Sequence, residues 1–507
     1  METHQSKVYF LNVHLNKKLT GVEQASLLRA KIFHEYLQIT PTIVTVRYNH
    51  QFRRVCQNHI AEGTLHPKLP LLNMYEDLQG TMLGTKQKEF QKAEHFTYKK
   101  GQNTNDYRVY CDDKLIQYVK RFEDGTIDYI NFVSNGKKIG RYKYDMNGYL
   151  SVYQVLDSET QRVLQEDFYH VDGTIRLKKY FRTVNQKHLL QSIVLFDKNG
   201  TVKNVFQSED ALIGYWLEYL FDEEVIYYCF IDKNRIYYPH LMKQLPSSNV
   251  KIIPCIHAMH TRSHTEVLKS GINRNYHEIF EDVTKPDAIV MLTEQQKEDI
   301  ATRFGEQGNY HVIPHTISQM PEEIQWTKRD PYKVVALCRY SKEKQLDQMI
   351  RIFASVVEQV PKATLEIYGF GSERGKLLKL IQELEMSQHI FLKGYVDDIS
   401  VVYHSASLSL LTSYTEAFSL STMESLAHGC PVVSYDIKYG PSDMIFNGEN
   451  GFLMPLDDQD QYAEKVSELL RTPCKLKKMS EAAYRYREAY AVQDISEKWQ
   501  QLLQDIT

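Results

Sequence analysis

The sequence predicts an α/β protein made of two doubly wound domains, with an antiparallel β-meander inserted into the first. Near both ends of the chain, apolar strand-like runs alternate with amphipathic helical segments, which is typical of parallel sheets covered by helices. Between them, Asn-Gly and Asp-Gly dipeptides separate alternating apolar runs, which indicates a series of hairpins. A chain of 507 residues also exceeds what one hydrophobic core usually serves, so we expect several domains.

The first domain begins with a strand, a helix and a second strand. KVYFLNV reads as a buried strand, and Thr20-Gly21 marks the start of a helix with apolar residues at helical spacing. ITPTIVTVRY follows as the second strand. We assign residues 1–75 and 211–318 to this domain, because helical and strand-like runs such as EDALIGYWLEYLF and EVIYYCFID resume after residue 210.

The β-meander is expected over residues 76–210. Its turns are predicted from Asn-Gly and Asp-Gly pairs, because both central residues of a type I′ turn need a positive φ. The pairs are Asp124-Gly125, Asn135-Gly136, Asn147-Gly148, Asp172-Gly173 and Asn199-Gly200.

The second domain is expected over residues 319–485. Strands such as KVVALC and TLEIYGFG alternate with helices such as LDQMIRIFASVVEQV, after a polar, proline-bracketed boundary near 319–330. Residues 486–507 form a final amphipathic helix. Two α/β domains of this kind leave a cleft between them.

The composition argues against several classes of protein. The apolar content of 42% and charged content of 25% are those of a globular protein, and the net charge of −3 gives no overall signal for nucleic acid. The seven cysteines are scattered and form no CxxC pair, which disfavours a metal cluster and fits a reducing compartment. The apolar run VYFLNV is too short for a signal peptide or a membrane span. We therefore expect a cytoplasmic protein without a membrane span.

Two cations follow the first strand of the second domain. Arg339 comes directly after the strand, and Lys344 precedes a helix, so both should lie at the carboxyl end of the sheet, where such folds bind ligands. Two cations beside a helix N-terminus suit a diphosphate. A solvated charged loop is the alternative.

A second group of candidates lies in YTEAFSLSTMESLAHGCPVV, which begins at residue 414. Ser421 and Glu424 fit a capping box that starts a helix, and Gly429 followed by a proline ends it. Capping does not explain Glu416, eight residues before Glu424. Both carboxylates can face one cleft and accept hydrogen bonds from sugar hydroxyls.

A third group is the histidine pair His257 and His260, which follows a predicted strand in IPCIHAMHTRS. An i, i+3 pair can form half of a metal site, but the sequence offers no convincing further ligands. Two polar histidines after a strand are the other interpretation.

Together these motifs resemble the retaining nucleotide-sugar glycosyltransferases of the GT-B type, family four. The shared pattern is E-x7-E after a strand, R-x4-K, G-x-PVV and an N-G-F-L element at residues 450–453. The resemblance implies two Rossmann-like domains facing a cleft, a final helix that crosses back to the first domain, and no metal requirement. This chain has EAFS where the family commonly has EGFG.

The resemblance also implies roles for individual residues. Arg339 and Lys344 would neutralise the diphosphate, Glu416 and His257 would contact the donor sugar, and Glu424 would bind the ribose. The remaining donor-binding candidates are His260, the backbone of Ser419, Leu420 and Ser421, and Gly21 of the first domain.

The inserted meander resembles that of a Gram-positive bacterial subgroup that includes GtfA, TarM and SdgA/SdgB, all of which use UDP-N-acetylglucosamine. Their acceptors are anionic or extended polymers. Residues 171–205 carry seven cations against two acidic residues, a charge of +5. A basic strand face fits an acidic acceptor, although lysines on edge strands also discourage aggregation.

The sequence therefore favours transfer of N-acetylglucosamine from UDP to serine hydroxyls of an acidic cell-surface protein, such as a Ser-Asp repeat or a Ser-rich adhesin. Glycosylation of wall teichoic acid, a polyribitol phosphate, is the alternative within the enzyme class. A non-catalytic GT-B partner or chaperone of a transferase is the alternative of another class. The exposed edge of the meander offers a place for a homo-oligomer to form.

Overall fold

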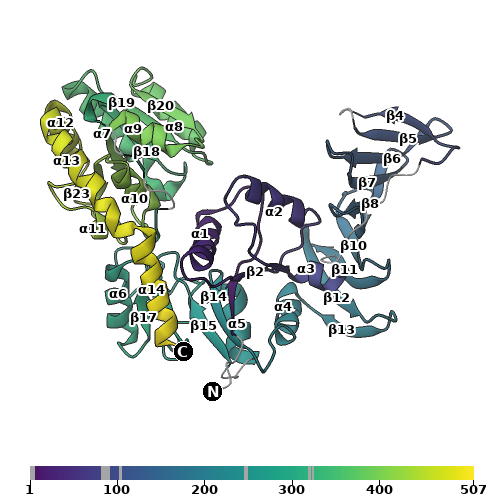
Figure 1. Cartoon of the computed structure of the whole chain (residues 1–507). Coiled ribbons are helices and arrows are strands. Elements are labelled where there is room, and N and C mark those ends of the chain that lie inside the picture. Colours follow the sequence, from purple (N-terminus) through teal and green to yellow (C-terminus); the bar gives the residue numbers. More distant parts are fainter. Residues whose placement is uncertain (1–5, 81–91, 102–104, 245–248, 318–320, 323–324) are drawn as a thin grey trace. The chain divides into compact units, whose positions relative to one another are not determined.

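The computed structural model describes the 507-residue chain except for residues 1–5, 81–91, 102–104, 245–248, 318–320 and 323–324 (Figure 1). The chain divides into two compact units, residues 1–252 and 253–507. We describe each unit by itself, and the finer domain boundaries expected from the sequence stay predictions. In the described part of the chain, no helix combines the length and the apolar character that crossing a membrane requires.

The first unit contains a five-stranded sheet of order β15-β14-β1-β2-β3. β1 pairs in parallel with both β14 and β2, and β2 with β3, as the alternating strand and helix runs predict. The strands are β1 (Ser6–Leu11), β2 (Thr42–Thr45), β3 (Leu71–Asn73), β14 (Ile226–Ile231) and β15 (Val250–Pro254). The helices are α1 (Gly21–Glu35), α2 (Phe52–Ala61), α3 (Met74–Gln79), α4 (Glu209–Glu218) and α5 (Asn234–Gln244).

Helix α1 begins where the sequence predicts. Thr20 is its N-cap, and its backbone N–H donates to Oε2 of Glu23 at 2.8 Å. Glu23 is fully buried and also pairs with His14 at 2.9 Å. This contact fixes the entry to the helix, and Gly21 is exposed as its first residue.

The predicted meander is a ten-stranded antiparallel sheet in which spatial order follows chain order (Figure 1). Its strands are β4 (Thr97–Lys100), β5 (Tyr107–Cys111), β6 (Lys114–Arg121), β7 (Ile127–Ser134), β8 (Lys137–Tyr144), β9 (Leu150–Leu156), β10 (Val163–Tyr169), β11 (Ile175–Val184), β12 (Lys187–Phe196) and β13 (Val202–Phe206). The meander was expected to begin at residue 76, but residues 74–79 form helix α3. Of the stretch up to β4, residues 81–91 lie outside the described residues.

All five predicted turns are present, but the expected geometry is wrong at four of them. Asn135 and Gly136 both have positive φ, 49° and 75°, as a type I′ turn requires. At the other four pairs only the glycine has a positive φ, and the ladder shifts register beside the turn. A type I turn followed by a glycine bulge explains both observations.

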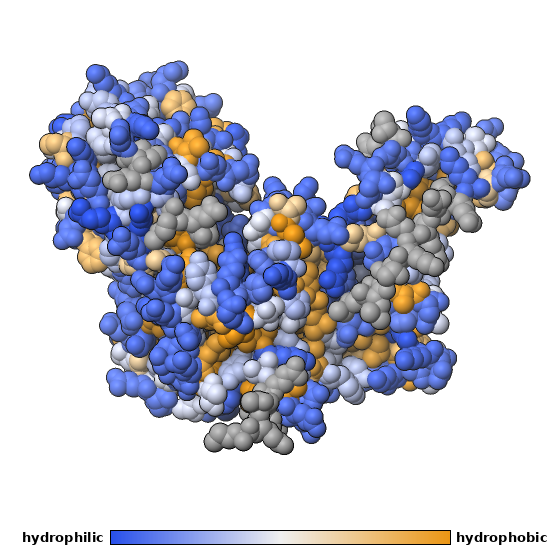
Figure 2. Space-filling model, in the orientation of Figure 1, coloured by the Kyte–Doolittle hydropathy of each residue, from blue (hydrophilic) through white to orange (hydrophobic). Residues whose placement is uncertain are grey.

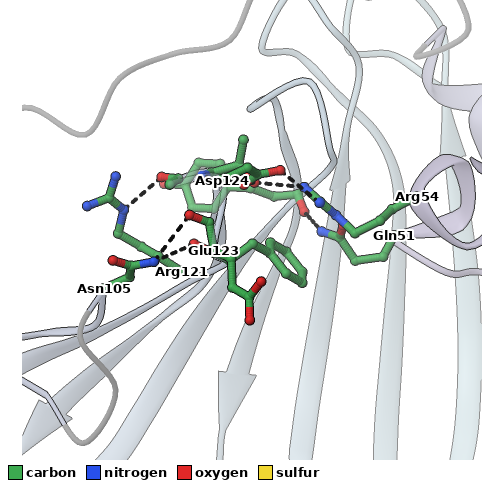
Figure 3. Close-up of polar contacts among 10 residues, drawn as sticks. Gln51, Arg54, Asn105, Arg121, Glu123 and Asp124 are labelled. Atoms are coloured by element: carbon green, nitrogen blue, oxygen red, sulfur yellow. Dashed lines mark hydrogen bonds and ion pairs between the residues drawn. The ribbon is translucent and has the colours of Figure 1, made fainter. Parts of the chain in front are cut away.

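One meander turn is attached to helix α2 of the α/β layer, as Figure 3 shows. Arg54 of α2 donates to Asp124 and to Thr126, each at 2.8 Å, and its Nε donates to Oε1 of Gln51 at 3.1 Å. The guanidinium also lies 4.0 Å from the ring centroid of Phe122. These contacts make α2 part of the support of the meander.

The seven cations of residues 171–205 do not form one basic strand face, so this expectation is wrong. Lys179 is buried and pairs with Glu209, while Lys178 lies 3.7 Å from Asp167. Arg176 is buried as well. The exposed cations are Arg182, Lys187, Lys198 and Lys203.

The visible surface of the meander is mostly hydrophilic, with scattered apolar spots (Figure 2). Its exposed large apolar residues are spread over several strands and turns: Ile139, Leu164, Val184, Leu189, Val202 and Val205. Exposed apolar residues spread in this way are ordinary for a protein surface.

The second unit contains a six-stranded parallel sheet of order β20-β19-β18-β21-β22-β23. Its strands are β18 (Asp330–Leu337), β19 (Thr364–Tyr368), β20 (Ile390–Gly394), β21 (Ala406–Leu411), β22 (Val432–Tyr435) and β23 (Gly451–Met454). A separate parallel pair consists of β16 (Ile289–Met291) and β17 (Tyr310–Val312). This agrees with the strands predicted from residue 333 onward.

Helices pack around this sheet, and the apolar spacing of α7 shows why. Its buried residues, which include Met349, Ile350 and Phe353, recur every three to four positions and join the core beneath β18 and β19. The helices of the unit are α6 (Glu294–Phe304), α7 (Leu346–Gln359), α8 (Arg374–Glu383), α9 (Ile399–Ser405), α10 (Leu420–Ala427), α11 (Pro441–Met444), α12 (Gln459–Arg471), α13 (Pro473–Tyr486) and α14 (Val492–Asp505). Short 3₁₀ turns are η2 (Trp326–Lys328), η3 (Lys342–Lys344) and η4 (Arg487–Tyr490).

Candidate functional site

The candidate site lies at the carboxyl edge of the six-stranded sheet. In an open α/β sheet, the loops that follow the strands form the ligand-binding edge. Here β18 leads to Arg339 and Lys344, β21 leads to Glu416, and β22 leads to Gly440. Three loops that are distant in sequence therefore end at one edge.

Lys344 and Glu416 form the centre of the site. The ammonium of Lys344 lies 2.5 Å from Oε1 of Glu416, and each side chain is only 13% exposed. The hydroxyl of Ser413 donates to the same oxygen at 2.7 Å. The structure thus brings together two predicted residues that are 72 positions apart, and it adds Ser413, which the sequence did not single out.

Backbone hydrogen bonds fix the loop that carries Glu416. Its N–H donates to the carbonyl of Lys438 at 3.2 Å, and the N–H of Tyr439 donates back to its carbonyl at 2.9 Å. Gly440 follows with a φ of 105°, and a Cβ atom there would lie 1.9 Å from the carbonyl oxygen of Phe418. Only glycine therefore permits this approach between the loops after β21 and β22.

Arg339 is placed differently from Lys344. Its side chain is 71% exposed and lies 3.1 Å from Glu343. The Ser341 hydroxyl donates to the same carboxylate at 2.6 Å. Burial raises the pKa of Glu343, but this hydrogen bond and the nearby cations outweigh it and hold the pKa below its usual value. Arg339 is thus available to a ligand at the same sheet edge.

Helix α10 begins two residues earlier than the capping-box prediction requires, so that prediction is wrong. Its N-cap is Ser419, whose φ of 69° lies in the left-handed region, and Leu420 is the first helical residue. Ser421 therefore lies inside the first turn. The first hydrogen-bonded amides are those of Thr422 and Met423, which both donate to the Ser419 carbonyl. Within the described residues, the N–H groups of Leu420 and Ser421 have no hydrogen-bond acceptor, as at an anion-binding helix start.

Glu424 is not a capping residue in this geometry. It lies in the second turn of α10, and no described residue forms a hydrogen bond or ion pair with its carboxylate. Burial raises its pKa to about 7. A half-buried carboxylate without a protein partner is suited to accept hydrogen bonds from a ligand's hydroxyl groups.

The two histidines occupy different environments. The ring of His257 is partly exposed and stacks parallel to that of His315, with centroids 6.2 Å apart. The ring of His260 is completely buried beside Phe280, Phe304 and Tyr439, and burial lowers its pKa to about 4. His257 can therefore reach a ligand directly, while His260 lies behind the surface.

Gly21 belongs to the other unit, so the structure does not test its expected approach to the phosphates. It is the exposed first residue of α1. Its amide is therefore at a helix start, as the Thr20-Gly21 pair predicts.

The sequence prediction missed an aromatic pair at the same sheet edge. Phe370 follows β19 and Tyr395 follows β20, with 54% and 68% of their side chains exposed and ring centroids 6.1 Å apart. Two exposed aromatic rings at the ends of adjacent parallel strands offer a stacking surface. The available signal was a glycine followed by an aromatic residue near the end of each predicted strand, Gly369-Phe370 and Gly394-Tyr395.

Comparisons with known proteins find similarity to glycosyltransferases. Residues 321–486 match the family model described as Glycosyl transferases group 1. The chain is 26% identical over 502 residues to the poly(glycerol-phosphate) alpha-glucosyltransferase of Bacillus subtilis. This alignment covers 97% of this chain and 74% of that protein. It is also 26% identical over 413 residues to the GtfA subunit of the UDP-N-acetylglucosamine–peptide N-acetylglucosaminyltransferase of Streptococcus gordonii. This alignment covers 78% of this chain and 78% of that protein.

Among solved structures, the fold is similar to that of a mutant of S. aureus TarM in complex with fondaparinux, alpha-GlcNAc-glycerol and UDP. The TM-score is 0.79 at 22% identity, over 98% of this chain and 99% of that one. This likeness identifies the fold class as GT-B, with an antiparallel sheet in addition to the parallel ones, as the sequence predicts.

Proposed function

We propose that the chain is a GT-B glycosyltransferase whose residues 321–486 form the glycosyl transferases group 1 domain. In the proposed reaction, it moves N-acetylglucosamine from UDP to a hydroxyl group of an anionic polymer with retention of configuration. The observation that carries the proposal is the Lys344–Glu416 pair beside the start of α10. It combines a cation and free amides for a diphosphate with carboxylates for sugar hydroxyls.

Each group has a role in this reaction. An ammonium group has three donors, so Lys344 can keep its contact with Glu416 and still donate to a departing diphosphate. Arg339 adds a second cation, and together they stabilise the leaving group as the glycosidic bond breaks. The acceptor hydroxyl attacks from the same face and passes its proton to the leaving phosphate oxygen, so no carboxylate acts as nucleophile.

The remaining groups orient the donor. Glu424 accepts hydrogen bonds from the ribose, and Glu416 and His257 contact the sugar. Phe370 and Tyr395 offer stacking surfaces to the nucleobase. No step of this scheme uses a metal ion.

The acceptor we favour is a serine hydroxyl of an acidic cell-surface protein. The similarity to GtfA supports it, because that protein's name assigns it a peptide acceptor. A polyol-phosphate acceptor is the second candidate, favoured by the similarity along 97% of the chain to a poly(glycerol-phosphate) transferase. The seven free cysteines fit a cytoplasmic location for either reaction.

The test incubates the full chain with labelled UDP-N-acetylglucosamine or UDP-glucose, and with a Ser-Asp repeat peptide or a polyol-phosphate chain in parallel. We expect N-acetylglucosamine on the peptide. Transfer only to the polyol phosphate, or only from UDP-glucose, would replace the acceptor or the donor in the proposal. Absence of UDP binding by calorimetry would instead favour a non-catalytic partner.

A further inference from the structure

A cavity of about 340 Å³ opens on the second unit away from the donor-site residues. One wall comes from the segment that includes η2, and the other comes from α13. The floor is formed by Arg329, Gly429 and Ser480. This volume lies in the range of small-molecule sites.

The cavity lies at the amino edge of the sheet, opposite the donor site. β18 starts at Asp330, directly after Arg329, and ends at Leu337, directly before the loop that carries Arg339. A strand of this length spans about 23 Å. A ligand in the cavity therefore does not contact Lys344 or Glu416.

The floor holds a buried cation that has no carboxylate partner among the described residues. Arg329 is 6% exposed, and its two terminal nitrogens donate to the carbonyls of Tyr403, Ala406 and His428 at 2.5–2.7 Å. Its Nε has no hydrogen-bond partner in the described part of the chain. The helix C-termini that supply these carbonyls offset part of the charge. Nε itself is buried, so an anion in the cavity would meet Nη2, which uses one hydrogen on His428 and lies beside Gly429 of the floor.

The walls add two aromatic rings. Trp326 of η2 and Tyr484 of α13 are both half-buried and line the cavity. Arg487 lies 3.6 Å from the ring centroid of Tyr484, and the hydroxyl of that tyrosine donates to the Pro321 carbonyl at 3.0 Å. One face of this ring is thus covered and its position is fixed. Rings held in this way offer apolar faces to the carbon skeleton of a ligand.

The rim is polar and carries one more cation. Gln325 and Thr327 line one side, and Lys477 and Glu481 line the other, all exposed. Amide, hydroxyl and carboxylate oxygens accept hydrogen bonds from hydroxyl groups, while Lys477 donates to an anion. The lining therefore combines an anion site with partners for several hydroxyl groups.

We propose that this cavity binds a phosphorylated sugar. Arg329 and Lys477 contact the phosphate, the sugar ring packs against Trp326 and Tyr484, and the rim accepts hydrogen bonds from the sugar hydroxyl groups. The site is additional to the donor site and does not depend on the proposed transfer reaction.

The test is calorimetric titration of the full chain with glucose 1-phosphate in the presence of saturating UDP. We expect saturable binding that is at least tenfold tighter than that of glucose or inorganic phosphate alone, because each fragment fills only part of the site. Loss of the signal on addition of UDP would place the binding in the donor site and overturn the proposal. Equal affinity for inorganic phosphate would overturn the sugar part of it.

A matched pair of variants tests the residues without risk to the fold. Lys477→Glu should weaken the binding of glucose 1-phosphate about tenfold, because it reverses a charge that contacts the phosphate. Lys478→Glu makes the same change on the next exposed residue of α13, which does not line the cavity, and should alter affinity less than twofold. Equal affinities for the two variants, or no saturable binding to the unmodified chain, would contradict the proposal.

Discussion

The ammonium of Lys344 and the carboxylate of Glu416 are in direct contact at 2.5 Å in a largely buried position. A buried ion pair is costly to break by removing one partner, because the other charge is left uncompensated. The contact therefore couples the loop after β18 to the loop after β21. A diphosphate that reaches Lys344 is consequently brought next to a carboxylate.

Removal of the lysine side chain should strongly reduce transfer. Lys344→Ala is expected to lower kcat/KM for UDP-N-acetylglucosamine about 10²–10³-fold, because one electrostatic contact to the leaving group is lost. Lys342→Ala is the control, since Lys342 is exposed in the same 3₁₀ turn. Turnover of the Lys344 variant near that of the control would rule out the phosphate role.

Donor binding should depend on pH through Glu424. Burial raises the pKa of this carboxyl to about 7, and sugar hydroxyls donate to its ionised form. The affinity for UDP-N-acetylglucosamine should therefore rise about tenfold between pH 6 and pH 8. Without donor, the raised pKa means that the folded state holds the Glu424 proton more tightly than the unfolded state does. The free energy of unfolding should therefore fall as pH rises from about 4.5 to 7.

Calorimetric titration across this pH range measures the affinity, and Glu424→Gln is the control. The variant should bind the donor more weakly, with an affinity that does not change between pH 6 and pH 8. A rise of the same size in the variant would assign the titration to another group.

Gly440 should tolerate no side chain. In Gly440→Ala, the new Cβ would lie 1.9 Å from the Phe418 carbonyl, so the loop that carries Glu416 must move. We expect at least a tenfold loss of kcat/KM and a free energy of unfolding about 2 kcal/mol lower than in the control. Gly448→Ala is that control, since Gly448 also has a positive φ but its nearest neighbour is 4.0 Å away. Urea unfolding compares the two variants, and equal stability would show that the loop absorbs the added methyl group.

Tyr395→Ala should weaken donor binding through the nucleobase. The exposed ring is expected to stack on the uracil, so the KM for UDP-N-acetylglucosamine should rise about tenfold with little change in kcat. Tyr332→Ala removes a tyrosine from β18 of the same sheet and serves as a control. A change in kcat alone for the Tyr395 variant would contradict a binding role.

Much of the fold could be predicted because local patterns and tertiary structure agree. The apolar spacing of α7 matches the face that it buries, and the strand before Arg339 ends within one residue of the end of its apolar run. The contact of Lys344 with Glu416 agrees with the prediction that both would lie at one sheet edge.

Other features depend on contacts that a linear pattern does not contain. The Ser421–Glu424 spacing fits a capping box, but the left-handed conformation of Ser419 starts the helix earlier. Lys179 reads as part of a basic strand, and only the fold places it against Glu209. Two meander turns, at Asp112-Asp113 and Asn185-Gln186, have positive φ at both central residues without a glycine and were not predicted.

Among the described strands, each inner strand of the meander pairs only with the strands before and after it in the chain. Adding or deleting one hairpin would therefore leave the order of the other strands intact and change the width of the sheet by about 10 Å. Nearest-neighbour pairing also keeps the contacts local, so such changes add little to the entropy of loop closure. The meander can thus vary in discrete steps, as a repeat array does, while the parallel sheets keep their architecture.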